Sequence, residues 1–116
     1  MTRKEILVFQ LHELRHELRD AVRGLADDQL FANAHPALNP IGWYAVHCMH
    51  NWDFFIHSAQ TGEALLAEEG ERRRTESYGY VPMTALETSS GMTGARVREI
   101  LGEVSGKCID LIENLD

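Results

Sequence analysis

The chain has 116 residues, of which 44% are hydrophobic and 25% are charged. This length and composition indicate a single globular domain over residues 1–116 and exclude a disordered or collagen-like chain. The formal net charge is −7, from 11 Lys and Arg against 18 Asp and Glu. Nucleic-acid binding is therefore not expected, because it needs a basic face.

Cysteine usage and hydropathy place the protein in the cytoplasm. Cys48 and Cys108 form neither a disulfide framework nor a Cys-x-x-Cys motif, so both are expected to be thiols in a reducing compartment. The apolar run at residues 6–9 is too short for the core of a signal peptide. No apolar stretch approaches the length of a membrane span, so we expect no contact with a membrane.

The first predicted helix runs from about Thr2 to Gly24. Thr2 and Glu5 form a capping-box pattern, and Gly24 is suited to end the helix. His12 and His16 lie one turn apart but outside the apolar stripe, among arginines, so we expect both to be exposed rather than to share a metal. The stripe recurs at steps of three and four residues and consists of Leu7, Leu11, Leu14, Leu18, Val22 and Leu25.

The second long helix is predicted to begin with Asn39 as its N-cap and Pro40 as its first residue. It passes through His57 and either ends near Gly62 or continues to Gly70. Apolar side chains lie on two of its sides, which is typical of the inner helix of a bundle.

Two connections join the predicted helices. A short helical turn over residues 26–33 links the first to the second. The polar stretch 70–82 is longer than most connections between helices, so it can carry the chain back along the bundle. The last helix would then run parallel to the second. It is predicted from about Gly94 to Leu115, with a helical lead-in from Thr84.

The second helix carries the candidate chemistry. His47 and His50 lie one turn apart on a face shared by Trp43 and Phe54, with Asn51 at its edge. Imidazole binds transition metals and exchanges protons near neutral pH. The spacing alone leaves two interpretations open, a ligand site and a pair of hydrogen-bonded core histidines. On either interpretation we expect Trp43, His47 and Phe54 to be buried.

The phrase Asn39-Pro-Ile-Gly-Trp-Tyr-Ala-Val-His47, followed by Asp53-Phe54-Phe55, resembles the second helix of the DinB/YfiT-like superfamily. Residues 25–30 and 35–38 resemble the connection that precedes it, so the resemblance covers the first half of the chain. Members of this superfamily are four-helix bundles, many of them metal-dependent, and several are thiol-dependent transferases or isomerases. The resemblance implies an all-α up-down bundle with a long crossover.

The same resemblance implies roles for the residues of the second helix. His47 stands at the family's metal-ligand position, and His50 would be a second ligand or a proton carrier. Trp43, Asn51 and Phe54 would line the pocket. The implied cofactor is a divalent transition metal, Zn or Ni, and the implied small-molecule partner is a thiol.

The chain departs from the family pattern, because the family's last helix is expected to be absent. The family carries two more ligand histidines there, as His-x-x-x-His, whereas this chain has no histidine after His57 and three long predicted helices. Three such helices leave apolar surface uncovered, so we expect a homodimer to complete the bundle.

Two hypotheses remain. One is a protein that binds a divalent metal or a small ligand beside His47, with thiol-dependent transferase or isomerase chemistry. The other is a non-catalytic dimeric bundle or interaction module without a metal site.

Overall fold

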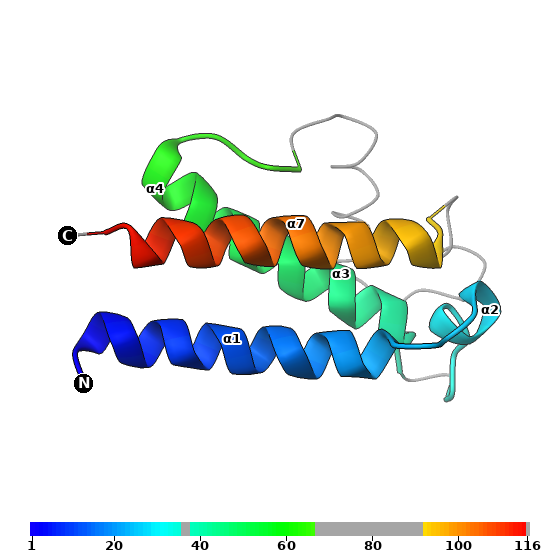
Figure 1. Cartoon of the computed structure of the whole chain (residues 1–116). Coiled ribbons are helices and arrows are strands. Elements are labelled where there is room, and N and C mark those ends of the chain that lie inside the picture. The colour runs from blue at the N-terminus through cyan, green and yellow to red at the C-terminus, as the bar shows by residue number, and fades with distance from the viewer. Residues whose placement is uncertain (36–37, 67–91, 116) are drawn as a thin grey trace.

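A computed structural model describes residues 1–35, 38–66 and 92–115, and every element within these ranges is helical (Figure 1). The second long helix is continuous from Ile41 to Thr61 and contains a π-helical segment, Asp53–Ser58. The predicted all-α bundle is therefore confirmed. In chain order the elements are α1 (Arg3–Val22), α2 (Asp27–Leu30), α3 (Ile41–Trp52), η1 (Asp53–Ser58), α4 (Ala59–Thr61) and α7 (Gly94–Glu113).

The three long helices form one layered bundle. Helices α1 and α7 lie side by side and antiparallel, so both termini are at the same end (Figure 1). Lys4 Nζ links the two helices at this end, because it donates to the carbonyls of Glu113 at 3.2 Å and Leu115 at 2.7 Å. Helix α3 packs against both and runs in the direction of α7, as predicted. The predicted crossover at 70–82 and the lead-in from Thr84 lie outside the described residues.

Local sequence signals set the helix ends. Thr2 Oγ1 accepts from Glu5 N, and Glu5 Oε2 accepts from Thr2 N, both at 3.1 Å, which confirms the capping box. Gly24 and Gly62 have φ of +71° and +79°, a conformation that favours glycine, and they follow α1 and α4. The end predicted near Gly62 is therefore confirmed.

The start of α3 differs from the prediction by one residue. Pro40 is the N-cap, with an extended ψ of 156°, and Ile41 is the first helical residue. Asn39 was predicted to be the N-cap and precedes it. The shift arises because Pro40 keeps an extended backbone, which places it outside the helix.

The buried side of α1 is narrower than its leucine stripe. Leu11 and Val22 are buried, whereas Leu7 and Leu14 are 41% and 47% exposed. Arg15 is half-buried, and its Nη2 donates to a backbone carbonyl of α7 at 3.5 Å. The contact surface of α1 is thus rotated from the stripe toward Arg15, which leaves one edge of the stripe in solvent.

The core lies between α3 and α7 and is closed at one end by α2. Phe31 follows α2 and covers Gly42 of α3. A Cβ atom on Gly42 would lie 2.7 Å from Phe31 Cε1 and 3.0 Å from the Leu30 carbonyl oxygen. The glycine of the Pro-Ile-Gly-Trp phrase therefore permits close packing of α2 on α3. Fully buried side chains of the core include Leu30, Val46, Met49, Val97, Ile100, Leu101, Val104 and Cys108. None of the described helices is long and apolar enough to cross a lipid bilayer.

Candidate functional site

The residues predicted to share one site fall into two groups. Trp43, His47 and Asn51 contact one another along α3. The rings of Trp43 and His47 are stacked, with centroids 4.7 Å apart and planes at 16°. Asn51 Nδ2 lies 3.3 Å from His47 Nε2. His50 and Phe54 instead line a small cavity beside η1.

The stacked pair contains two nitrogen atoms without partners. Trp43 Nε1 and His47 Nδ1 are shielded from solvent and form no hydrogen bond in the described part of the chain. Since Asn51 Nδ2 donates, His47 Nε2 accepts and the ring proton lies on Nδ1. Both nitrogens are then unsatisfied donors, each costing about 1–3 kcal/mol. Such atoms are rare in native proteins, and they mark this part of α3 as a candidate site.

A groove lies on the other side of Trp43 from His47 in the chain of ring contacts, beside Tyr44. The indole of Trp43 meets the ring of Tyr44 edge-on, with centroids 4.9 Å apart and planes at 86°. Tyr44 lines this groove of about 320 Å³ at the start of α3, which is close to the lower size of ligand pockets. The other lining residues are Gln29, Ala32, Ala34, Leu38, Asn39 and Ile41.

The burial predictions for this face have mixed outcomes. Trp43 is 8% exposed, which confirms its burial, and His47 is half-buried. Phe54 is 56% exposed, so its predicted burial is wrong. The reason is that Phe54 lies within η1, where a wider turn replaces the α-helical repeat and Asp53 takes the inward position.

His12 and His16 are exposed, as predicted. His12 Nε2 lies 3.6 Å from a carboxylate oxygen of Glu113, and His16 Nε2 lies 3.2 Å from one of Asp20. The side chains of these two histidines are 51% and 68% exposed. Both belong to the charged surface of α1.

The described side chains do not fit a transition-metal site on their own. In residues 1–35, 38–66 and 92–115, no group of three His, Cys, Asp or Glu side chains is placed to hold a metal. Residues 67–91 add glutamates to the sequence but no histidine or cysteine. A zinc site takes three or four protein ligands, so His47 and His50 would need ligands from elsewhere.

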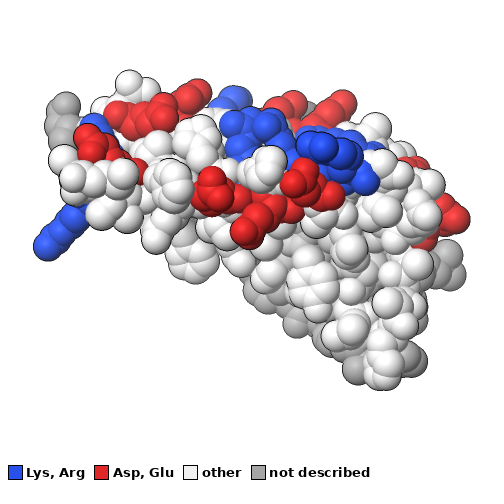
Figure 2. Space-filling view, turned by 60° about the horizontal axis from the view of Figure 1, so that its bottom comes forward, with Lys and Arg blue, Asp and Glu red and all other residues white. Residues whose placement is uncertain are grey.

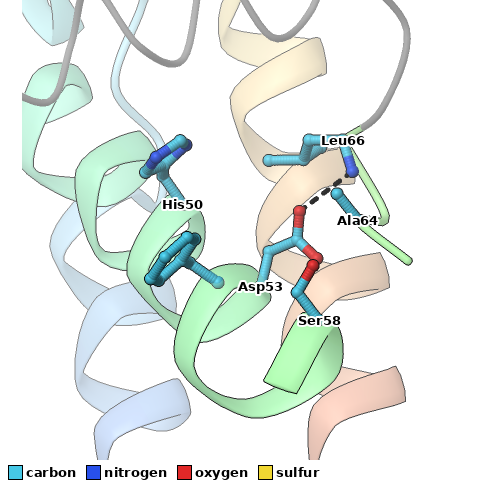
Figure 3. Close-up of a pocket in the computed structure, with 6 residues that line it drawn as sticks. His50, Asp53, Ser58, Ala64 and Leu66 are labelled. Atoms are coloured by element: carbon cyan, nitrogen blue, oxygen red, sulfur yellow. Dashed lines mark hydrogen bonds between the residues drawn. The ribbon is translucent and has the colours of Figure 1, made fainter. Parts of the chain in front are cut away.

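Asp53 is the acidic residue that begins η1. It is 4% exposed, and its carboxylate oxygens accept from the backbone N–H groups of Leu65 at 2.8 Å and Leu66 at 3.1 Å. Figure 3 shows Asp53 directed toward the segment that carries Ala64 and Leu66, with His50 on the preceding turn, in α3. The cavity between them measures about 10 Å³, which is room for one water molecule at most.

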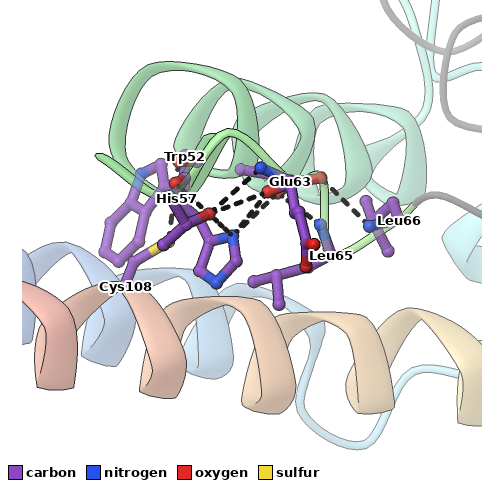
Figure 4. Close-up of polar contacts among 8 residues, drawn as sticks. Trp52, His57, Glu63, Leu65, Leu66 and Cys108 are labelled. Atoms are coloured by element: carbon purple, nitrogen blue, oxygen red, sulfur yellow. Dashed lines mark hydrogen bonds and ion pairs between the residues drawn. The ribbon is translucent and has the colours of Figure 1, made fainter. Parts of the chain in front are cut away.

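His57 and Cys108 complete the polar contacts around η1 (Figure 4). His57 Nδ1 donates to the carbonyl of Glu63 at 2.8 Å, so the ring proton lies on Nδ1. Cys108 Sγ donates to the carbonyl of Trp52 at 3.5 Å. Burial, together with the charge of Asp53, raises the pKa of the Cys108 thiol to about 11. The contacts of Asp53 and His57 hold residues 63–66 against η1, and burial keeps Cys108 protonated.

We predict that Cys108 makes the folding stability of the protein fall with rising pH in the alkaline range. The unfolded thiol has a pKa of about 8.5, below its value in the folded protein. Between these two values the folded state holds the proton more tightly, so stability falls as pH rises from about 9 to 11. Urea denaturation of wild type and Cys108→Ala at pH 8 and pH 10 measures the effect. An equal decline in the variant would assign the pH dependence to other groups.

A comparison with protein-family models matches residues 10–116 to the DinB superfamily. The chain belongs to the DinB superfamily. The match includes α7 and thus extends beyond the first half of the chain, which carries the resemblance seen in the sequence. No curated protein and no solved structure matches this DinB-superfamily chain.

Two site features went beyond the sequence analysis. Asp53 was part of the family phrase, but no role was predicted for it. The signal was available, because Asp53 is the one carboxylate within residues 41–57. Tyr44 was not assigned to the site either, since its contact with Trp43 joins adjacent residues and no helical spacing indicates it.

Proposed function

We propose that this DinB-superfamily protein binds a small molecule with a carboxylate group beside His47. The observation that carries the proposal is the pair of buried donors, Trp43 Nε1–H and His47 Nδ1–H, on stacked rings. A carboxylate supplies acceptors, and an acceptor that satisfies a buried donor removes its desolvation cost. The apolar groove lined by Tyr44, whose ring contacts that of Trp43, offers room for the rest of the molecule.

The alternative is that His47 binds a divalent metal, Zn or Ni. It would need the opposite tautomer, with a lone pair on Nδ1 and Nε2–H donating to the Asn51 side chain. That requires Asn51 to present its oxygen where its nitrogen now lies. The carboxylate is favoured because it needs neither this change nor the missing metal ligands. A ligand that also carries a thiol would suit thiol-dependent transferase or isomerase chemistry.

Calorimetric titration with glutathione, succinate, Zn²⁺ and Ni²⁺ tests the proposal. Glutathione carries a thiol and carboxylates, and succinate carries carboxylates alone. We expect saturable binding of at least one of the two, lost in His47→Ala. Trp43→Phe should weaken it by about tenfold at most, the value of one hydrogen bond. His16→Ala, which removes an exposed histidine, is the matched control and should bind as wild type does.

Two results would contradict the proposal. One is the absence of saturable binding of both carboxylate probes. The other is stoichiometric uptake of Zn²⁺ or Ni²⁺ that depends on His47, which would establish the metal in place of the carboxylate. Nitrogen-15 spectra of the His47 ring provide an independent readout. The carboxylate site requires the proton on Nδ1, whereas the metal site requires it on Nε2.

We also propose that the protein is a homodimer. This corresponds to the second hypothesis, a helical interaction module. The supporting observation is a pair of exposed aromatic rings on η1. Phe54 and Phe55 are 56% and 69% exposed and contact each other edge-on, with centroids 5.0 Å apart. Exposed adjacent aromatics are typical of interface cores, and a second copy would cover them isologously.

Light scattering at micromolar concentrations measures the oligomeric state. We expect a dimer in wild type and a shift toward monomer in Phe55→Ser. Phe9→Ser removes another exposed phenylalanine, from α1, and is the matched control. A wild-type monomer, or the same shift in both variants, would contradict a dimer built on η1.

The cytoplasm is the proposed location. Cys48 and Cys108 are both free thiols, and burial raises the pKa of each. Unpaired thiols are typical of reducing compartments. Fractionation of the native host tests this location.

A further inference from the structure

A groove with basic side chains lies where the end of α1 meets the first turns of α7. Its volume is about 290 Å³. The surface view in Figure 2 shows basic atoms gathered together and bordered by acidic side chains. Half of the residues that line the groove are arginines, although the net charge of the chain is −7. The lining consists of Arg19, Val22, Arg23, Gly24, Arg98 and Leu101.

The guanidinium groups of the three arginines differ in their hydrogen bonds and ion pairs. Arg98 Nη2 donates to the carbonyls of Val22 at 2.8 Å and Leu25 at 2.7 Å, which fixes its guanidinium at the end of α1. Arg23 Nη2 lies 3.0 Å from a carboxylate oxygen of Asp20, in an exposed pair. The guanidinium of Arg19 forms no ion pair or hydrogen bond with any described residue. The guanidinium of Arg98 is therefore fixed, that of Arg23 is shared with the exposed Asp20, and that of Arg19 is open to a ligand.

The positive charge around the groove is only partly neutralised. Arg15 lies beside Arg19, and this like charge contributes to lowering the pKa of Arg15, after burial, the larger cause. The Nε atom of Arg15 is buried without a partner among the described residues. Asp110 opposes Arg15, and Asp20 opposes Arg23. Arg19 and Arg98 have no carboxylate partner among the described residues.

Helix electrostatics explain part of this arrangement. Basic side chains near a helix C-terminus interact favourably with the helix dipole, and Arg98 satisfies carbonyls at the end of α1. The dipole does not require an open volume beside the charges. It also does not require an apolar floor, which Val22 and Leu101, each 2% exposed, form beneath the groove.

We propose that this groove binds a small phosphate monoester with an apolar body. Its phosphate has up to two negative charges and three acceptor oxygens, which suit the forked donors of Arg19 and Arg23. Arg98 adds a fixed positive charge, and Val22 and Leu101 contact the apolar body. The site uses no residue of α3 and is independent of the function proposed at His47.

Titration with phenyl phosphate and inorganic phosphate at low ionic strength tests the site. We expect saturable binding of one phenyl phosphate per chain, tighter than that of inorganic phosphate. The double variant Arg19→Gln/Arg23→Gln should weaken it by about tenfold or more, since it removes charge-assisted hydrogen bonds. Arg3→Gln removes an equal charge at the other end of α1 and should leave the affinity within about twofold of wild type.

The variants are suited to this test because the side chains of Arg19 and Arg23 are exposed and donate to no backbone carbonyl of a described residue. Circular dichroism and thermal melting should therefore match wild type. Three results would overturn the proposal: no saturable binding of phenyl phosphate, equal affinity for inorganic phosphate, or equal losses in the double variant and Arg3→Gln.

Discussion

Replacing Asp53 with alanine is expected to lower the free energy of unfolding by about 2–5 kcal/mol. The carboxylate of Asp53 is buried and accepts from the backbone N–H groups of Leu65 and Leu66. Each hydrogen bond to a charged group contributes about 1.5–3 kcal/mol, and each buried donor left unsatisfied costs about 1–3 kcal/mol. Leu66 is itself part of the core, at 3% exposed, so loss of its anchor also weakens core packing.

Urea denaturation measures this loss, and two variants define its cause. Asp28→Ala removes an exposed aspartate from α2 and should change stability by no more than about 0.5 kcal/mol. Asp53→Asn retains one acceptor oxygen but turns an N–H group toward the second backbone donor, so it should lie between wild type and Asp53→Ala. If Asp53→Ala behaves like Asp28→Ala, the Leu65 and Leu66 amides do not depend on this carboxylate.

The helices were predictable from the sequence because their signals are local. The capping box of Thr2 and Glu5 and the terminating Gly62 depend on residues within one turn. The apolar repeat of α7 is strong, and nine residues of that helix are buried. The direction of α7 relative to α3 also followed from the length of the connection between them.

The orientation of side chains around these helices was less predictable. A helical wheel assumes a constant turn per residue, and η1 breaks this assumption immediately after Trp52. Phe54 therefore lies outside, and Asp53 inside, although the wheel placed Phe54 with Trp43 and His47. The buried side of α1 likewise depends on where α7 lies, since tertiary contacts decide which part of a stripe is covered.

The candidate site was predictable in its residues but not in its chemistry. Helical spacing placed Trp43, His47 and Asn51 on neighbouring positions, and the structure brings their side chains together. Spacing does not indicate which nitrogen of His47 holds the proton. That depends on Asn51 and on the burial of Nδ1, and it decides between a carboxylate and a metal.

Leu30 shows how a short connection can determine the packing of the bundle. It belongs to the four-residue helix α2, is fully buried, and lies against α7, where a Cβ atom on Gly94 would be 2.9 Å from Leu30 Cδ1. Leu30→Ala is expected to lower the free energy of unfolding by about 2–5 kcal/mol, through lost apolar burial and the resulting cavity. A domain of this size has a total stability of about 5–15 kcal/mol, so this loss would be a large fraction.

Leu38→Ala is the matched control for Leu30→Ala, because it removes the same atoms from a side chain that is 51% exposed. Denaturation curves should show a change of no more than about 0.5 kcal/mol for Leu38→Ala. Equal losses in the two variants would contradict the role of α2 in the core. Since Leu30 holds the adjacent Phe31 over Gly42, Leu30→Ala should also loosen the start of α3. Faster amide hydrogen exchange at Trp43 and Tyr44 would show that α2 supports the ligand groove as well as the core.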